Sequence, residues 1–226
     1  MHVEAATIFS LPGLLLLALS GCHTASTERG KPEASTMTSA TPAVAKKATD
    51  PGHVGRGTPL TAREGDVLAA FAGGCFWGVE DVFRQVPGVV ATAVGYTGGH
   101  TDDPTYRAVC SHTTGHAEAV LVEFDPKVVT YDTLVRVFFK NHDPTTKNRQ
   151  GPDVGDQYRS AVFFFSPAQQ TAAKAAIASE QSLRDKPIVT EVSPIGRFWK
   201  GEEYHQQYDE KSGTHSCPLP KGLDGT

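Results

Sequence analysis

The stretch Val67-Leu68-Ala69-Ala70-Phe71-Ala72-Gly73-Gly74-Cys75-Phe76-Trp77-Gly78-Val79-Glu80 joins two different sequence patterns. Residues 67–72 are continuously apolar and short, which predicts a fully buried strand. From residue 79 the apolar side chains recur every three or four positions up to Val86, which predicts a helix. Cys75 therefore lies at a strand-to-helix turn. Unpaired backbone N–H groups and the positive end of the helix dipole favour a thiolate there.

Cys75 can be interpreted in two ways. A cysteine after a strand is most often a small buried hydrophobic residue. Here Gly73 and Gly74 give the backbone room to turn sharply and to approach a ligand, and Phe76 and Trp77 place two aromatic rings beside the sulfur. These features favour a reactive nucleophile over a packing residue.

Composition bounds the class of protein. The chain has 226 residues and a net charge of -4, which gives no indication of nucleic-acid binding. Its four cysteines are too few for a disulfide scaffold at this length. Neither a C-x-x-C motif nor paired histidine spacing is present, so we expect no metal site.

The N-terminus predicts export. Residues 8–19 are apolar but too short to span a bilayer, and they have the length of a signal-peptide core. Leu19-Ser20-Gly21-Cys22 follows and resembles a lipobox, so residues 1–21 are expected to be a lipoprotein signal peptide and Cys22 to be lipidated. The alternative is an ordinary signal peptide with an incidental Cys22. No Lys or Arg precedes the apolar run, where signal peptides normally carry positive charge.

The residues after Cys22 differ in composition from the rest of the chain. Residues 22–64 are rich in small and polar side chains and cannot bury enough surface to offset their ordering entropy, so we expect a disordered tether. As a coil, its ~43 residues would average roughly 33–39 Å end to end. This arrangement predicts a protein anchored by lipid to a bacterial membrane, on the periplasmic side or at the cell surface, with a folded catalytic domain in residues 65–226.

The folded domain is expected to be α+β. Expected strands are residues 67–72, 89–94, 116–124, 161–165 and 188–192, and expected helices are residues 76–85, 131–141 and 167–183. Thr130 and Ser166 are expected to cap the second and third helices. The order of elements predicts a two-layer sandwich with a mixed sheet on a ferredoxin-like core. We expect residues 95–104 to form a long loop, and residues from 194 onward to form a long irregular tail.

Several segments together resemble the peptide methionine sulfoxide reductase A family, over about residues 67–217. Beyond residues 73–80 they are Pro104-Thr105-Tyr106 with Val109-Cys110-Ser111, Thr114-Gly115-His116-Ala117-Glu118, Asn141-His142-Asp143-Pro144-Thr145, Asp153-Val154-Gly155 with Gln157-Tyr158-Arg159-Ser160, and Glu203-Tyr204-His205-Gln206-Gln207-Tyr208. The resemblance implies thiol-dependent reduction of methionine S-sulfoxide, free or in oxidised proteins. It also implies no bound cofactor and a thioredoxin-like or other dithiol reductant. We expect a monomer.

Glu118 is the expected acid. In residues 116–124 it shares a face with three large apolar side chains, and such surroundings raise the pKa of a carboxyl. From the residues alone, a carboxylate that bends out to water is the better interpretation. The resemblance instead implies that Glu118 protonates the sulfoxide oxygen while Cys75 attacks the sulfur.

The resemblance also implies roles for five further side chains. Tyr106 and Tyr158 would donate hydrogen bonds to the sulfoxide oxygen, although ordinary packing is the common role of tyrosine. Asp143 would be the acidic residue that orients the site, with a helix-terminal turn as its alternative. Phe76 and Trp77 would form the apolar wall for the substrate methyl group, with core packing on the first helix as the alternative.

Cys217 resembles the resolving cysteine of the family. No cysteine follows it in the sequence, so the resemblance implies a direct Cys75–Cys217 disulfide as the bond that the reductant cleaves. We expect Cys110 to be a buried free thiol, and a Cys75–Cys110 bond is the rival pairing. Two other functions stay open from the residues: a thiol peroxidase using the same cysteine pair, and a non-catalytic surface lipoprotein.

Overall fold

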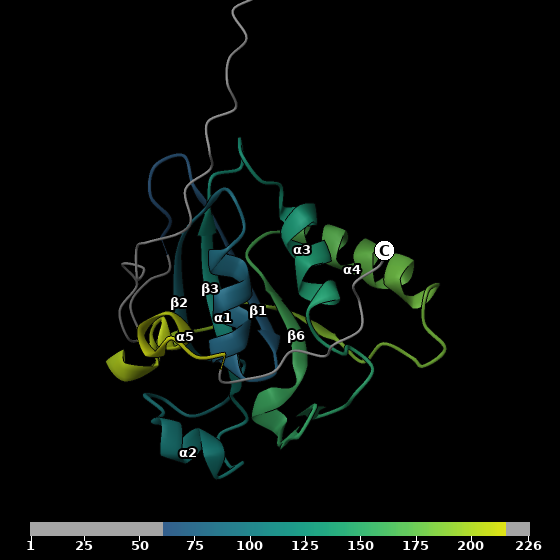
Figure 1. The fold of residues 1–226 in the computed structure, drawn as a ribbon. Helices are drawn as coiled ribbons and strands as arrows, with labels where there is room; N and C mark the ends of the chain where they lie inside the picture. Colours follow the sequence, from purple (N-terminus) through teal and green to yellow (C-terminus); the bar gives the residue numbers. More distant parts are fainter. Residues whose placement is uncertain (1–60, 216–226) are drawn as a thin grey trace, which may run out of the picture. The chain divides into compact units, whose positions relative to one another are not determined.

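A six-stranded mixed sheet forms the centre of the structure, a computed structural model that describes residues 61–215 (Figure 1). The expectations for residues 1–60 and 216–226, including those for Cys22 and Cys217, lie outside this range. Within residues 61–215, no helix has the length and apolar character needed to cross a membrane.

The sheet has the strand order β7-β6-β1-β3-β2-β8, and its one parallel pair is β6 with β7. The strands are β1 (Val67–Gly73), β2 (Val89–Thr97), β3 (Ala117–Phe124), β6 (Ser160–Phe164), β7 (Glu191–Pro194) and β8 (Trp199–Lys200). A separate hairpin consists of β4 (Arg149–Gln150) and β5 (Asp153–Val154). The helices are α1 (Phe76–Arg84), α2 (Tyr106–Cys110), α3 (Tyr131–Lys140), α4 (Pro167–Gln181) and α5 (Tyr208–Ser212), with 3₁₀ turns η1 (Asp156–Tyr158) and η2 (Glu203–His205).

The main elements confirm the expected architecture. The order β1-α1-β2-β3-α3-β6, with β6 and β3 on either side of β1, is a ferredoxin-like core to which β7 and β8 add the edges. In Figure 1, α1 crosses in front of the central strands, and α3 and α4 lie side by side. Two of the helix starts behave as their sequences predict, because Thr130 and Ser166 each accept a hydrogen bond from the backbone N–H three residues later.

The two faces of the sheet bury different side chains. On the helix-covered face Phe71 is fully buried, with its ring 4.8 Å from Phe83 of α1 and 5.2 Å from Phe138 of α3. The other face carries mostly small residues of β1, β2, β3 and β6, together with the rings of Phe163 and Phe198. Large aromatic packing therefore fixes α1 and α3 against β1.

Two expectations about element boundaries were wrong. β2 continues to Thr97, so the loop begins only at Gly98, because β3 pairs with residues 95–97 and β8 adds pairs to Gly95 and Tyr96 on the other side. The approach is close: a Cβ at Gly95 would meet the backbone oxygen of Trp199. The last expected strand begins at Glu191 instead of residue 188, because the backbone N–H groups at 188 and 189 bond to Gln181 and Pro144 outside the sheet. The described chain after residue 194 is largely irregular, as expected, with the short elements β8, η2 and α5 within it.

We expect Phe71→Ala to lower the free energy of unfolding by ~3–5 kcal/mol, because the cavity would open between β1, α1 and α3. Urea denaturation followed by circular dichroism measures this loss. Leu183→Ala is the matched control, since Leu183 is 77% exposed and its truncation should change stability little. Equal losses in the two variants would contradict the assignment of Phe71 to the centre of the core.

Candidate active site

Cys75 is the N-cap residue of α1, as the sequence predicts. The turn from β1 requires Gly74, whose φ is +107° and whose Cβ position would lie 2.6 Å from the Gln150 side chain. Cys75 is disulfide-bonded, whereas Cys110 is a free thiol. The bond therefore does not join these two residues.

Glu118 lies beside the same helix start. Its side chain is 2% exposed, and its Oε2 accepts a hydrogen bond of 3.1 Å from the backbone N–H of Phe76, the residue after Cys75. Burial raises the pKa of Glu118 to about 8. The hydrogen bond from Phe76 opposes that rise, and the nearby Asp153 carboxylate adds to it. A carboxyl with this pKa is mostly protonated at neutral pH and can donate its proton.

Tyr106 and Tyr158 face the same carboxyl from two different elements. Tyr106 begins α2 and Tyr158 ends η1, and both side chains are partly buried. Burial raises the pKa of Tyr106 well above its usual range and that of Tyr158 to about 12, and a Glu118 charge raises both further. Both hydroxyls therefore stay protonated and available as hydrogen-bond donors next to Glu118.

Phe76 and Trp77 form one side of an aromatic wall, and the segment after β8 supplies the other. The Trp77 ring stacks on Tyr208 with centroids 3.9 Å apart and planes 12° apart. Its Nε1–H donates to Nδ1 of His205 at 3.0 Å, and the His205 ring also lies 5.0 Å from Phe76 and 4.5 Å from Tyr106. Burial lowers the pKa of His205. The wall is therefore a set of neutral rings, which suits an apolar group of a ligand.

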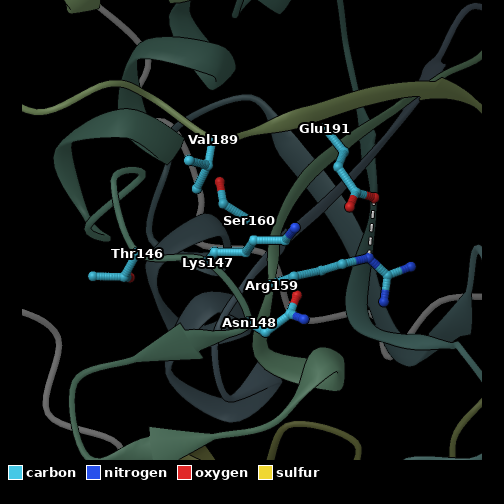
Figure 2. A pocket seen from close by; sticks show the side chains of 7 residues that line it. All are labelled: Thr146, Lys147, Asn148, Arg159, Ser160, Val189 and Glu191. Carbon is cyan, nitrogen blue, oxygen red and sulfur yellow. Dashed lines mark hydrogen bonds and ion pairs between the residues drawn. The ribbon is translucent and has the colours of Figure 1, made fainter.

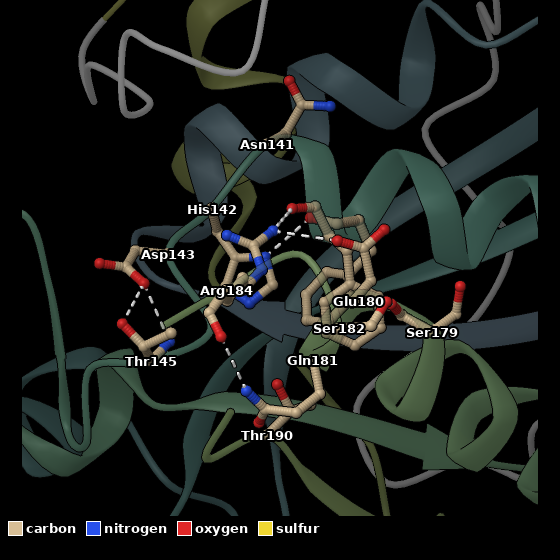
Figure 3. A network of polar contacts seen from close by, with 12 residues as sticks. Asn141, His142, Asp143, Thr145, Ser179, Glu180, Gln181, Ser182, Arg184 and Thr190 are labelled. Atoms are coloured by element: carbon tan, nitrogen blue, oxygen red, sulfur yellow. Dashed lines mark hydrogen bonds and ion pairs between the residues drawn. The ribbon is translucent and has the colours of Figure 1, made fainter. Parts of the chain in front are cut away.

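Asp143 does not lie among these groups. Figure 3 shows its carboxylate turned toward Thr145, whose backbone N–H and hydroxyl donate to Oδ1 at 2.9 and 2.6 Å. The charged or titratable groups that act on it are Arg184 and the buried His142. Asp143 therefore stabilises the turn after α3, which was the alternative that the sequence left open.

Asp153, on the hairpin strand β5, takes the place expected for Asp143. Its carboxylate contributes to the raised pKa of both Glu118 and Tyr158, and burial raises its own pKa. The sequence signal was an acidic residue between Gly151 and Gly155, two glycines with positive φ that fold the hairpin back. His205 and Tyr208 belong to a segment that carries the resemblance, but the sequence assigned them no role, because they lie in a region without a regular pattern.

Cys110 is a free thiol, as expected, but it is only partly buried. It ends α2, where its thiol makes a hydrogen bond with Tyr106 and is close enough to Glu118 for electrostatic interaction. Burial raises the pKa of the Cys110 thiol, which lowers its reactivity near neutral pH.

A hollow of about 250 Å³ at the β6–β7 edge is a separate feature (Figure 2). Arg159 crosses it and is occupied by internal partners: its Nε donates to Glu191 at 3.1 Å and its Nη1 to the backbone oxygen of Asp156 at 3.0 Å. None of the side chains around Glu118 lines this hollow, so it is not part of the site. Within residues 61–215, no group of three or more His, Cys, Asp or Glu side chains could hold a metal ion.

Known proteins share both the sequence and the fold. The sequence profile of the family "Peptide methionine sulfoxide reductase" matches residues 67–223. A peptide methionine sulfoxide reductase MsrA of Methanosarcina acetivorans is 59% identical over 155 residues, which cover 66% of this chain and 81% of that protein. The reduced form of Mxr1 from Saccharomyces cerevisiae has a TM-score of 0.67 and 37% identity, covering 71% of this chain and 93% of that one. Mxr1 in complex with Trx2 has a TM-score of 0.50 and 27% identity, covering 72% and 94%.

We expect Asp153→Asn to lower the pKa of Glu118 below about 8, because removing the neighbouring negative charge makes ionisation of Glu118 easier. The Glu118 carboxyl can be followed by ¹³C NMR of the glutamate-labelled protein, with Glu118→Gln assigning its signal. Asp143→Asn is the matched control and should leave this pKa unchanged. An unchanged pKa in Asp153→Asn, or an equal shift in Asp143→Asn, would overturn the placement of Asp153.

Proposed function

This chain belongs to the peptide methionine sulfoxide reductase family, and from that membership we propose the route by which its residues perform the reaction. Methionine sulfoxide is reduced at the expense of thiols, so no bound cofactor is needed. One observation carries the proposal. The 3.1 Å hydrogen bond from the Phe76 N–H to Glu118 places a carboxyl with a pKa of about 8 beside the helix start that carries Cys75.

In the first step the Cys75 thiolate attacks the sulfoxide sulfur. The S–O bond electrons move toward oxygen, and Glu118 transfers its proton to that oxygen. Tyr106 and Tyr158 donate hydrogen bonds to the oxygen as negative charge develops on it. In the resulting adduct the hydroxyl moves from the substrate sulfur to the Cys75 sulfur, and the bond between the two sulfur atoms breaks with its electron pair left on the substrate. Methionine leaves, and Cys75 is left as a sulfenic acid. The rings of Phe76 and Trp77 bind the substrate methyl group.

Asp153 takes the supporting role that the resemblance assigned to Asp143. The negative charge of Asp153 disfavours ionisation of Glu118 and so helps to keep Glu118 protonated at neutral pH. We assign the S epimer of the sulfoxide, in proteins and as the free amino acid, because epimer specificity distinguishes this family from its counterpart.

In the second step the Cys217 thiol attacks the Cys75 sulfenic acid, forming a disulfide and releasing water. The described chain supports this partner, since Nδ1 of His215 lies 3.8 Å from Asp81 of α1. Cys217 follows His215 by two residues, which reach at most ~7 Å. Cys75 lies six residues from Asp81, about 9 Å along the helix. The described chain that precedes Cys217 therefore ends beside α1, the helix that Cys75 caps.

A dithiol then reduces the Cys75–Cys217 bond. The structure of yeast Mxr1 with Trx2 supports a thioredoxin or a thioredoxin-like protein as this donor. The attacking thiol would form a mixed disulfide, and its second thiol would release the reduced enzyme.

We further propose that the domain is anchored outside the cytoplasm by lipid on Cys22. The support is the lipobox-like Leu19-Ser20-Gly21-Cys22 after an apolar run, followed by the polar residues up to 64. Residues 1–21 would be removed, and residues 22–64 would serve as the tether for a catalytic domain of residues 65–226.

Cys75→Ser should form no methionine, whereas Cys217→Ser should form one methionine per enzyme, because the first step needs only the Cys75 thiol. The stranded sulfenic acid in Cys217→Ser should react with dimedone, and turnover with thioredoxin should collapse. Cys110→Ser is the control and should keep wild-type turnover. Methionine formation by Cys75→Ser would refute the nucleophile, and normal thioredoxin turnover in Cys217→Ser would refute the resolving role.

Cys22→Ala should release the protein from the membrane fraction of a bacterial host or leave it uncleaved, because the thiol that carries the lipid is gone. Labelling with radioactive palmitate should mark the wild type alone. A full-length, soluble, cytoplasmic wild type would refute the anchor and would agree with the absence of Lys and Arg before the apolar run.

A further inference from the structure

Glu80 of α1 is a buried carboxylate outside the chemistry described above. It is 1% exposed and accepts three hydrogen bonds. Oε1 receives the Thr92 hydroxyl at 2.8 Å and the Gln207 side-chain amide at 2.9 Å, and Oε2 receives the Gln207 backbone N–H at 2.7 Å. Two of the three donors belong to one residue that is 127 positions away in the sequence.

Gln207 has an unusual backbone conformation. Its φ is +50°, in the left-handed region that residues other than glycine rarely adopt. On its N-terminal side, the Gln206 side chain accepts from the Val94 N–H and donates to the Val94 carbonyl, each at 2.9 Å. The bonds to Glu80 and to β2 thus hold the chain in a turn that it would not prefer by itself.

A second contact ties the same segment to α1. The Arg84 guanidinium, 3% exposed, binds Oε2 of Glu210 at 3.0 and 2.8 Å and the Thr92 hydroxyl at 3.2 Å. The contact between α1 and α5 is packed so closely that no water molecule fits within it. Glu80 binds Gln207 in the buried part of the contact between α1 and α5, and Arg84 binds Glu210 at its more exposed edge. The chain is therefore attached to α1 on both sides of Tyr208.

The attached segment is the one that completes the aromatic wall. Tyr208 follows Gln207 directly and stacks on Trp77 at 3.9 Å, and His205 precedes Gln207 by two residues and accepts the Trp77 N–H bond. Neither ring belongs to the helix that carries Cys75. Their positions against Trp77 depend on the attachment of a distant segment to that helix.

We propose that Glu80 is a positioning residue for substrate binding: through Gln207 it holds Tyr208 and His205 against Trp77 and so shapes the pocket for the sulfoxide methyl group. This inference rests on the proposed function for the identity of the ligand. Its geometric part, that Glu80 sets the contact between Trp77 and Tyr208, does not depend on catalysis.

The test compares Glu80→Gln, Gln207→Gly and Glu210→Gln with the wild type. Glutamine at position 80 has one acceptor oxygen for three donors and places an amide N–H₂ against the others. Gln207→Gly keeps the backbone N–H and tolerates the positive φ, but it removes the side-chain bond. Glu210→Gln weakens only the contact between Arg84 and Glu210, which is more exposed. Glu191→Gln is the matched control, because Glu191 pairs with Arg159 at 3.1 Å on the β7 edge, away from the wall.

Two measurements separate positioning from a general loss of structure. Single-turnover reduction of a methionine sulfoxide peptide gives KM and the maximal rate independently. The second is Trp77 fluorescence, measured in a Trp199→Phe background so that Trp77 is the only tryptophan of the chain.

We expect KM to rise roughly tenfold in Glu80→Gln, as for a lost buried hydrogen-bond partner. The rise should be smaller in Gln207→Gly and about two- to threefold in Glu210→Gln. The maximal rate should stay unchanged, since Cys75 and Glu118 are untouched. The emission wavelength of Trp77 should shift most in Glu80→Gln, less in Gln207→Gly and least in Glu210→Gln. Glu191→Gln should change neither KM nor the emission wavelength.

An unchanged KM together with unchanged Trp77 emission in the three variants would overturn the proposal. A lower amplitude of active enzyme at constant KM would show a merely structural role and would also overturn it. If Glu80→Gln fails to fold, the two milder variants still decide. A wild type that reduces no sulfoxide would refute the proposed function, whereas the fluorescence series would still test the positioning.

Discussion

The hydrogen bond between the Phe76 N–H and Glu118 joins two opposing electrostatic effects on which the site depends. The N-terminus of α1 presents free N–H groups and a partial positive charge, and these stabilise an anion. Burial of Glu118 at 2% exposure penalises the same anion. Burial prevails, and the pKa of Glu118 is about 8. One helix start can therefore favour a thiolate at Cys75 and still keep a proton on its neighbour.

This balance requires that charge near Glu118 be controlled from several elements. Asp153 on β5 raises the pKa of Glu118, and a Glu118 charge in turn raises the pKa of Tyr106 on α2 and Tyr158 on η1. These residues come from two separate connections of the sheet, β2 to β3 and β3 to β6. The rigid core holds β3 and α1 in place through large rings such as Phe71, so the loops need only carry their side chains to a preformed centre.

The C-terminal segment closes the site from another direction. Its pairing with β2 through β8 and Gln206, and its attachment to α1 through Glu80, bring His205 and Tyr208 onto Trp77. The long-range hydrogen bonds of this segment replace the regular ladder that it lacks. A stretch without periodic apolar residues is thus held in place by long-range hydrogen bonds.

The sequence by itself determined the central strands, the capped helices, Cys75 at a helix start and Glu118 on an apolar strand face. These features depend on neighbours two to four residues apart, which the periodicity of the chain encodes directly. Only the tertiary structure showed that Asp153 lies near Glu118 while Asp143 turns toward Thr145, because this depends on the path of the chain after α3. The same holds for Glu80 and Gln207, which are 127 residues apart. Their contact depends on how the C-terminal segment packs on the sheet, and no local sequence pattern predicts that packing.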